Sequence, residues 1–461
     1  MFLGVSMALQ VTVIISLLVI LLFAGCPVMA ALGCTAIVGM LLFMDQYVWS
    51  RFATTAYQMG ISASMLIPPL FVIMSEFLSQ GGIAEDIFAL LNRLMRKIKG
   101  GLAMATTLTC TLFAALCGSS PATAASVGKI AISSMTKRKY RKDFAAGTVG
   151  AGGTLGILIP PSMTLVGFGI LTQTSIAKLL VAGVFPGLML SGLMIISIFI
   201  RSKINPALIG EMTKEQLEQK KYDADAYAVD LNNPPIDDIA TARGKELFMY
   251  LVKIVPALIL IVLVFGCMYT GIATPTECAG IGAIGAFVIL LANRRMKKEM
   301  FFSCLKSTAR TTCMIVFMMT AGMSMTFVLA YLKVPATLTS ILINAGMSKY
   351  VIIVAVYILW FIMGCFMDPG SMAMLTIPFL FTTLVDLGFD PVWLGVVSVM
   401  MTEVGMITPP FGLNIFVLRA STDMDIKHII KGNIPYVAVL LLGVALVTIF
   451  PQIALYLPGR M

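Results

Sequence analysis

Two short segments decide how this chain folds: Leu158-Ile159-Pro160-Pro161-Ser162 and Ile407-Thr408-Pro409-Pro410-Phe411. Each segment places two adjacent prolines inside an apolar stretch, and the two pairs are 249 residues apart, from Pro160 to Pro409. Proline lacks a backbone N–H and clashes with the preceding helical turn, so each pair breaks a helix and frees carbonyl groups. Lipid cannot satisfy free carbonyls, so both breaks must be lined by protein or water. Broken helices in corresponding positions of two halves indicate the substrate and ion site of a transporter.

The composition predicts an all-α polytopic membrane protein. Of the 461 residues, 59% are hydrophobic and only 12% are charged, whereas charged residues make up about a quarter of soluble domains. Several apolar runs approach the roughly 20 residues that cross a bilayer, for example Val11–Ala24, Ile254–Tyr269, Val351–Phe366 and Tyr436–Leu457. The opening stretch lacks the basic start of a cleavable signal, so we expect Leu9–Phe23 to be the first span.

The net charge of +10 lies in clusters between spans, which indicates membrane orientation rather than nucleic-acid binding. The positive-inside rule places these clusters in the cytoplasm; they are Arg93–Lys99, Lys137–Lys142, Arg201–Lys203 and Arg294–Lys298. The nine cysteines show no C-x-x-C spacing, and His428 is the only histidine. Neither a disulfide framework nor a transition-metal site is therefore expected.

The separation of 249 residues extends beyond the prolines. It also pairs Gly156 with Gly405, Gly183 with Gly432, and Pro186 with Pro435. Shared glycines and prolines imply shared backbone breaks, so we predict two structural repeats over residues 1–203 and 247–461. The polar segment 204–246 between them is expected to be a cytoplasmic linker.

Threading the first repeat through the charge clusters predicts crossings at Leu9–Phe23, Val28–Phe43 and Ser64–Leu78. The next segment, about 101–136, has basic clusters at both ends and must enter and leave on one face. We predict a re-entrant helical hairpin bent at Cys117–Pro121. A broken helix at about 143–173 then leads to a last crossing at Val184–Ile200.

The second repeat starts in the cytoplasm, so its elements run in the opposite direction. We expect crossings at Leu251–Tyr269, Ala279–Ala292 and Thr311–Ala330, a hairpin at about 350–388 bent at Asp368–Ser371, and a broken helix at about 391–419. About five crossings plus one hairpin per half make the two repeats inverted, as in carriers with alternating access. Both termini are then periplasmic.

Residues Gly82–Lys99 have apolar positions at helical spacing opposite Asp86, Arg93 and Lys97. This pattern predicts an amphipathic helix in the membrane interface. It serves either as a simple connector or as an arm that joins a moving hairpin to a fixed scaffold.

The hairpin tips and helix breaks carry the candidate sodium and substrate ligands. Ser120 and Asp368 each precede a proline, which predicts a helix N-cap at each tip. Free carbonyls and hydroxyls suit Na⁺, and helix N-termini suit a carboxylate. The predicted ligands are Gly118, Ser119, Ser120, Thr123, Gly153, Gly156, Pro160, Pro161 and Ser162 in the first half, and Gly364, Asp368, Gly370, Ser371, Glu403, Thr408, Pro409, Pro410 and Asn414 in the second. The alternative is that these small residues only allow close helix packing.

Glu277, Asp368 and Glu403 are the candidate acids in apolar segments. Glu277 completes the capping box Thr274-Pro275-Thr276-Glu277, which favours a structural role. A carboxylate at membrane depth is a functional candidate. For Asp368 and Glu403, binding a ligand and hydrogen bonding to backbone exposed by the breaks both remain open.

At these residues the chain resembles the large membrane subunit of TRAP transporters, the tripartite ATP-independent periplasmic carriers. The resemblance spans nearly the whole chain, although Met401 stands where the family pattern has an asparagine. The segments that carry it are Gly118–Thr123, Gly152–Ser162, Gly271–Glu277 and Glu403–Asn414.

The resemblance implies a sodium-coupled elevator in the bacterial inner membrane that imports a small organic acid, such as a C4-dicarboxylate or sialic acid. It implies Na⁺ at the hairpin tips as the coupling ion and no other cofactor. The implied partners are a small four-helix membrane subunit, expected to be a separate chain, and a periplasmic substrate-binding protein.

Three other functions are alternatives to a tripartite carrier. A carrier of di- or tricarboxylates that works alone, coupled to Na⁺ or H⁺, would have the same architecture without a binding protein. An intramembrane aspartyl protease requires two facing aspartates, and the first half has no counterparts of Asp368 and Glu403. A purely structural scaffold gives no reason for polar breaks in both halves, so we expect a carrier and not an enzyme.

Overall fold

The computed structural model describes residues 7–44, 50–210, 244–422 and 424–461. Every regular element in these ranges is a helix, and seven helical segments among them are long and apolar enough to cross a membrane. The prediction of an all-α polytopic membrane protein is confirmed. Most of the predicted linker 204–246, from residue 211 to 243, lies outside the described residues.

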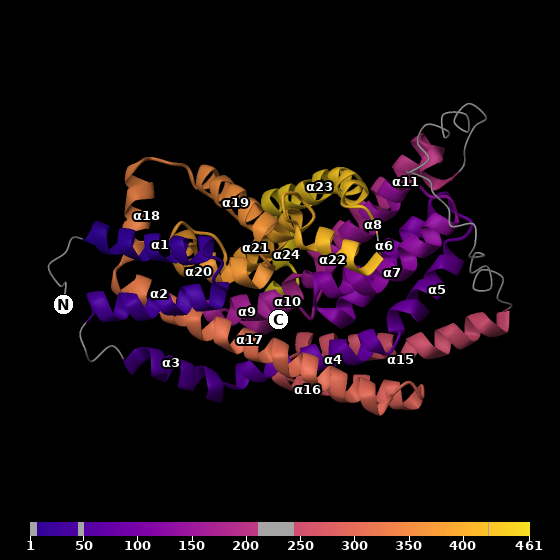
Figure 1. The fold of residues 1–461 in the computed structure, drawn as a ribbon, viewed down its shortest axis with the longest axis horizontal. Coiled ribbons are helices and arrows are strands. Elements are labelled where there is room, and N and C mark those ends of the chain that lie inside the picture. The colour runs from indigo at the N-terminus through magenta and orange to yellow at the C-terminus, as the bar shows by residue number, and fades with distance from the viewer. Residues whose placement is uncertain (1–6, 45–49, 211–243, 423) are drawn as a thin grey trace.

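One group of helices lies along the bottom and at the left of the view in Figure 1. Its close contacts join sequence-distant helices: Gly33 faces Ala321, Gly282 faces Met74, and Phe77 stacks with Phe301. We call this group the scaffold helices; they are α1 (Met7–Phe23), α2 (Val28–Phe43), α3 (Ser50–Ile61), α4 (Ile67–Gln80), α15 (Gly244–Tyr269), α16 (Pro275–Ala292) and α17 (Lys298–Tyr331).

The hairpins and broken helices form the second group, which fills the rest of the molecule in Figure 1. We call them the core helices. From the first half they are α6 (Gly101–Cys117), α7 (Ser120–Lys137), α8 (Lys142–Thr154), α9 (Met163–Thr172), α10 (Ile176–Ala182) and α11 (Val184–Ile204). From the second half they are α19 (Lys349–Phe366), α20 (Pro369–Asp386), α21 (Pro391–Met406), α22 (Leu413–Thr422), α23 (Ile426–Ile449) and α24 (Gln452–Leu455).

Helix boundaries recur at the separation of the two proline pairs. Helix α7 begins at Ser120 and α20 at Pro369, and α8 begins at Lys142 and α21 at Pro391, each 249 residues later. Pairs α6–α7 and α19–α20 are helical hairpins, and they lie toward opposite ends of the long axis in Figure 1.

The scaffold helices are more numerous and longer than the sequence predicted. The predicted crossing Ser64–Leu78 consists of most of a short 3-10 turn (Ala63–Leu66) and most of α4, and α3 precedes it. The predicted crossing Thr311–Ala330 is the last part of the 34-residue α17. Helix α18 (Val334–Asn344) was not predicted. An apolar window cannot detect α3, which contains Arg51, Thr54, Gln58 and other polar residues.

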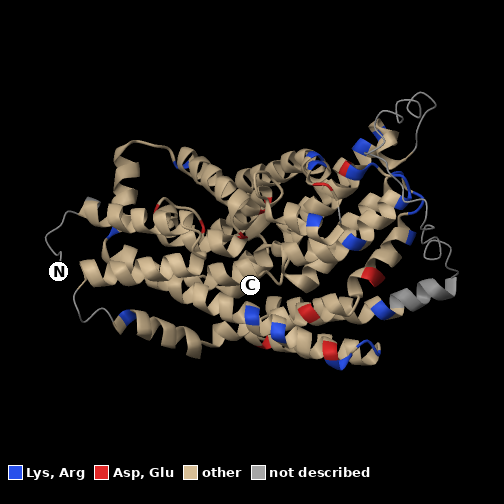
Figure 2. Ribbon diagram, in the orientation of Figure 1, with Lys and Arg blue, Asp and Glu red and all other residues tan. Residues whose placement is uncertain are grey.

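The predicted amphipathic helix exists as α5 (Ile83–Leu94), which ends earlier than expected. Its Asp86 pairs with Arg295 at the end of α16 at 2.7 Å, and Arg295 also donates to the carbonyls of Gly81 and Gly82. This bonding fixes the start of α5 to the scaffold. Figure 2 shows Lys and Arg gathered at the right-hand end of the molecule, where α5, α7, α11 and α16 end.

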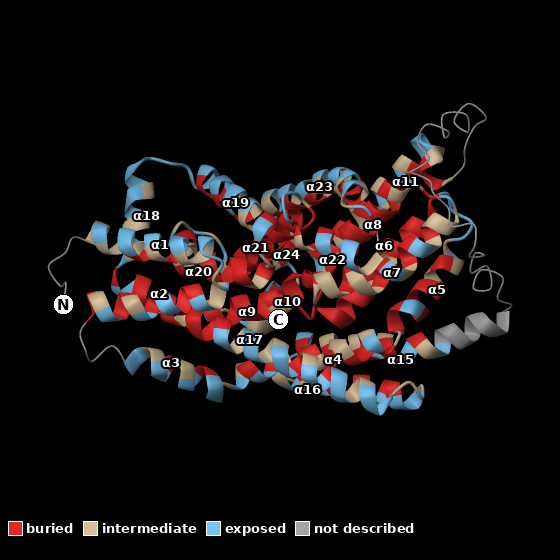
Figure 3. Cartoon of the chain, in the orientation of Figure 1, coloured by how far each residue is buried: buried red, intermediate tan, exposed pale blue. Residues whose placement is uncertain are grey.

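Two glycine pairs bring core helices into backbone contact. A Cβ on Gly147 would lie 2.1 Å from the carbonyl oxygen of Gly432, between α8 and α23. A Cβ on Gly405 would lie 2.6 Å from Cα of Gly364, between α21 and α19. Small residues permit this spacing in membrane helices, and the result is the continuous buried core in the centre of Figure 3.

Candidate substrate and ion site

A cavity of about 320 Å³ lies where both hairpin tips meet the scaffold. Its walls come from both halves of the chain and from both helix groups. The lining includes Cys117–Ser119, Pro121 and Ala122 at the first tip, Asp368–Gly370 at the second, Ile157, Met163, Thr164 and Leu413 near the helix breaks, and Ser75, Glu76 and Thr311 on α4 and α17.

The first tip is a tight turn against the first helix break. Gly118 has a left-handed backbone (φ 66°), and a Cβ there would lie 2.0 Å from the Pro161 carbonyl oxygen, so only glycine fits. The N-cap of α7 is Ser119, not Ser120 as the sequence predicted. Proline is tolerated throughout the first turn of a helix. The Ser120-Pro121 motif was therefore compatible with an N-cap at either Ser119 or Ser120.

Ser120 instead joins the two halves. It begins α7, is 0% exposed, and its hydroxyl accepts a 2.7 Å hydrogen bond from Nδ2 of Asn414, which is also 0% exposed. Asn414 lies just after the second break, at the start of α22. The Gly412 N–H donates to the Cys365 carbonyl at 2.9 Å, so the second break also contacts the second hairpin.

The first break is fully buried beneath the first tip. A Cβ on Gly156 would meet the Ser119 carbonyl and the Thr123 hydroxyl at 2.6 and 2.7 Å, and one on Gly153 would meet Ala124. Thr123 donates to the Ser119 carbonyl, and Ser162 caps α9 by accepting from Leu165 N–H. These contacts hold the break, with Pro160 and Pro161, against the tip.

The second tip carries one of the two carboxylates that line the site. Asp368 caps α20 as predicted: it accepts from the Ser371 N–H at 3.0 Å and from the Ser371 hydroxyl. Asp368 and Gly370 line the cavity, whereas Gly364 lies behind the tip against α21.

Of the eighteen predicted ligands, four line this cavity: Gly118, Ser119, Asp368 and Gly370. The other fourteen do not, among them Glu403, Thr408, Pro409 and Pro410. Pro409 and Pro410 are exposed, and the Thr408 hydroxyl donates to the Val404 carbonyl. Glu403 is 0% exposed within α21, and neither of its carboxylate oxygens has a hydrogen-bond partner. The two proline pairs, equivalent in sequence, therefore differ in environment.

Glu76 lines the cavity although it was not among the predicted ligands. This half-buried acid lines the cavity from α4; it accepts from the Ser307 hydroxyl of α17 at 2.6 Å and from Gln80 at 2.9 Å. A carboxylate inside the predicted span Ser64–Leu78 was the available signal, because ionisable groups in spans mark functional sites.

The cavity combines groups for a cation with groups for an anion. Its described lining has two acids, Glu76 and Asp368, and no Lys, Arg or His. Oxygen ligands suit a hard cation, while the N-termini of α7 and α20 at the tips favour negative charge. No cluster of metal-ligating side chains occurs among the described residues.

Comparison with known proteins decides the family. The family model described as tripartite ATP-independent periplasmic transporter, DctM component, matches residues 14–453. The chain belongs to this family. The C4-dicarboxylate TRAP transporter large permease protein of Pseudomonas aeruginosa is 34% identical over 93% of this chain and 94% of its own length.

Family members differ in their named substrates. A sialic acid TRAP transporter large permease protein of Vibrio cholerae is 29% identical, over 95% of this chain and 96% of its own. An ectoine TRAP transporter large permease protein of Halomonas elongata is 28% identical, over 97% and 98%.

Among solved structures, the Alcanivorax borkumensis YdaH transporter superposes with a TM-score of 0.61 at 14% identity, covering 90% of this chain and 88% of that one. At this identity the likeness shows the fold alone. The chain is thus a multi-pass membrane protein of the TRAP large permease family.

Proposed function

We propose that this protein imports a small organic acid across the bacterial inner membrane by Na⁺-coupled alternating access. The observation that carries the proposal is the cavity shared by both hairpin tips, the helix breaks and scaffold helices α4 and α17. The substrate would be a C4-dicarboxylate, sialic acid or a similar carboxylate. A periplasmic binding protein would deliver it, and a small four-helix membrane subunit would complete the complex.

We propose inverted repeats over residues 1–203 and 247–461, joined by a cytoplasmic linker. The recurrence of helix starts at 249 residues supports this division, and so do the hairpins at opposite ends of the molecule. The basic end of Figure 2 is then cytoplasmic and both termini are periplasmic. Alkaline phosphatase fused to either terminus should be active; inactive fusions at both would refute the orientation.

The two helix groups fit an elevator. The core helices contact each other through backbone, at Gly147–Gly432 and Gly364–Gly405, as a rigid transport domain requires. The candidate cavity lies between this group and α4 and α17. Movement of the core helices past the scaffold helices would expose the cavity to each side in turn.

Sodium is proposed to bind at the hairpin tips. The test is uptake into proteoliposomes that hold this chain and its membrane partner, with binding protein outside, at a series of Na⁺ concentrations. Ser120→Ala at the first tip or Thr408→Ala at the second break should raise the Na⁺ concentration for half-maximal uptake, whereas Tyr357→Phe should not, because its hydroxyl bonds Thr448 and does not line the cavity. Unchanged Na⁺ dependence in both variants would refute the proposed sites.

The second candidate is a di- or tricarboxylate carrier that works alone, coupled to Na⁺ or H⁺. The observation that keeps this candidate is that helices of this chain line the candidate cavity on both sides, from the tips and from α4 and α17. Uptake of free substrate without binding protein would establish this function and refute the tripartite one.

A further inference from the structure

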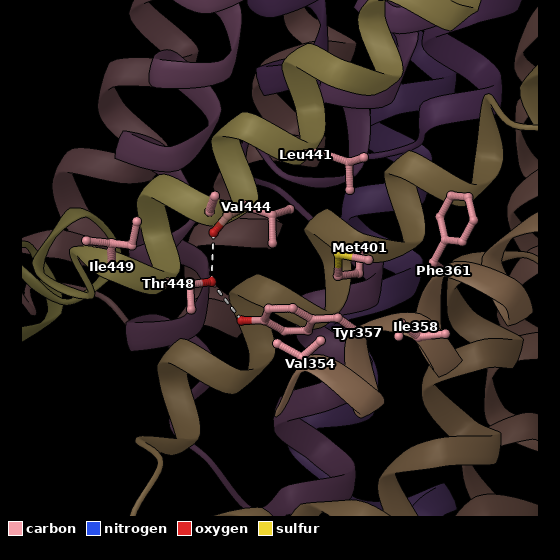
Figure 4. Close-up of a pocket in the computed structure, with 10 residues that line it drawn as sticks. Val354, Tyr357, Ile358, Phe361, Met401, Leu441, Val444, Thr448 and Ile449 are labelled. Carbon is pink, nitrogen blue, oxygen red and sulfur yellow. Dashed lines mark hydrogen bonds between the residues drawn. The ribbon is translucent and has the colours of Figure 1, made fainter. Parts of the chain in front are cut away.

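The outer surface of the core helices has a groove that is separate from the cavity at the tips. It runs between α19 and α23, with α21 as its floor, and has a volume of about 430 Å³. In Figure 4, Val354, Ile358 and Phe361 of α19 lie opposite Leu441 and Val444 of α23, and Met401 lies between the helices. Val354, Ile358 and Leu441 are among the exposed apolar side chains of the protein.

The groove has one polar position, at one end. The hydroxyls of Tyr357 and Thr448 form a 2.9 Å hydrogen bond that joins α19 to α23, and Thr448 also donates to the Val444 carbonyl. Because these hydroxyls bind each other and the backbone, they do not require a polar ligand. The groove is therefore suited to an apolar chain.

A second pocket continues the groove toward the end of the molecule. Both pockets are lined by Thr448 and Ile449, and the second also contains Lys349, Tyr350 and Trp393. Lys349 begins α19, and its ammonium lies 5.6 Å from the ring centre of Tyr350 and 6.0 Å from that of Phe389. Lysine beside tyrosine and tryptophan is typical of the membrane–water interface.

Lys349 has no acidic partner among the described residues. Asp390 lines the same pocket, but its carboxylate caps α21 by accepting from the N–H groups of Val392 and Trp393. The Lys349 ammonium is thus the group of this pocket that a phosphate could complement.

The length of the combined groove matches one leaflet. From Lys349 to Phe361 helix α19 rises about 18 Å at about 1.5 Å per residue, and half of a hydrocarbon core of about 30 Å is about 15 Å. We propose that this groove is a specific phospholipid site, with one acyl chain between α19 and α23 and the phosphate at Lys349. The bound lipid would pack against α19, the first helix of the second hairpin.

Native mass spectrometry of the purified, delipidated chain in detergent tests this site, with phosphatidylglycerol bearing palmitoyl and oleoyl chains as the probe. Wild type should retain one lipid. Ala445→Trp places an indole in the groove from an exposed position and should abolish retention. Leu442→Trp is the matched control, exposed on the same helix but outside the groove lining, and should retain the lipid.

Lys349→Gln tests the phosphate separately, and should weaken phosphatidylglycerol binding about fivefold, as expected for loss of one basic residue at a membrane surface. Equal retention in Ala445→Trp and Leu442→Trp would refute the acyl-chain site. Equal binding of a phosphate-free fatty acid, or displacement of the lipid by the partner membrane subunit, would refute the assignment to phospholipid. A thermal melt of each variant shows that it is folded.

Discussion

The hydrogen bond between Ser120 and Asn414 makes the sharpest prediction about how the site is assembled. It joins residues 294 apart, at a hairpin tip and a helix break, and both side chains are fully buried. Ser120→Ala leaves the Asn414 amide N–H without its partner, and Asn414→Ala leaves the Ser120 hydroxyl without its own. Each single variant should lose about 1 to 3 kcal/mol of unfolding free energy, the usual cost of an unsatisfied buried polar group.

The double variant removes both groups, so its loss should be smaller than the sum of the single losses. Hydrogen bonds between membrane helices give coupling energies of about 0.6 kcal/mol on average and up to about 1.7 kcal/mol. Because both side chains are fully buried, we expect a coupling energy in the upper half of that range. The assay is equilibrium unfolding of the purified chain in mixed micelles by SDS titration, followed by circular dichroism.

The control is Ser120→Ala combined with Tyr357→Phe, because Tyr357 bonds Thr448 and shares no partner with Ser120. This pair should be additive within about 0.5 kcal/mol. If the losses of Ser120→Ala and Asn414→Ala also add within about 0.5 kcal/mol, the hydrogen bond does not form. That result would refute the direct contact between the first tip and the second break.

Three further predictions concern the glycine contact between α19 and α21, the carboxylate of Glu76, and the contact of Arg295 with the start of α5. Gly405→Ala should destabilise the protein by about 1 to 3 kcal/mol, because its Cβ would strike the α19 backbone, whereas Gly266→Ala, with open space around it, should not lower the melting temperature. Glu76→Gln should raise the Na⁺ concentration for half-maximal uptake about fivefold, equivalent to about 1 kcal/mol of lost charge attraction; unchanged Na⁺ dependence would mean that Glu76 only binds α17. Arg295→Lys should lower the unfolding free energy by about 1 to 3 kcal/mol in SDS titration, because one ammonium cannot reach both carbonyls and Asp86 as the guanidinium fork does. Wild-type stability of this variant would show that Arg295 does not hold α5 to the scaffold helices.

The site was predicted in part from the sequence. Asp368 was recognised because a carboxylate before proline is a local capping signal, and the structure shows that cap. Glu76 was missed because its importance depends on Ser307 and on the first tip, which are distant in sequence. Ser120 was placed at the correct tip with the wrong contact, because its partner lies in the other half.

The membrane class, the family resemblance and the positions of bends and breaks could be predicted from the sequence, because hydrophobicity, proline and glycine act on the nearest turns of backbone. The sequence also indicated the equivalence of the two halves through the separation of 249 residues. Helix packing, in contrast, buries the first proline pair under a hairpin tip, leaves the second pair exposed, and brings Glu76 to the same cavity as Asp368. These outcomes depend on which helix surfaces pack together, and packing joins residues whose spacing in the chain carries no signal of contact.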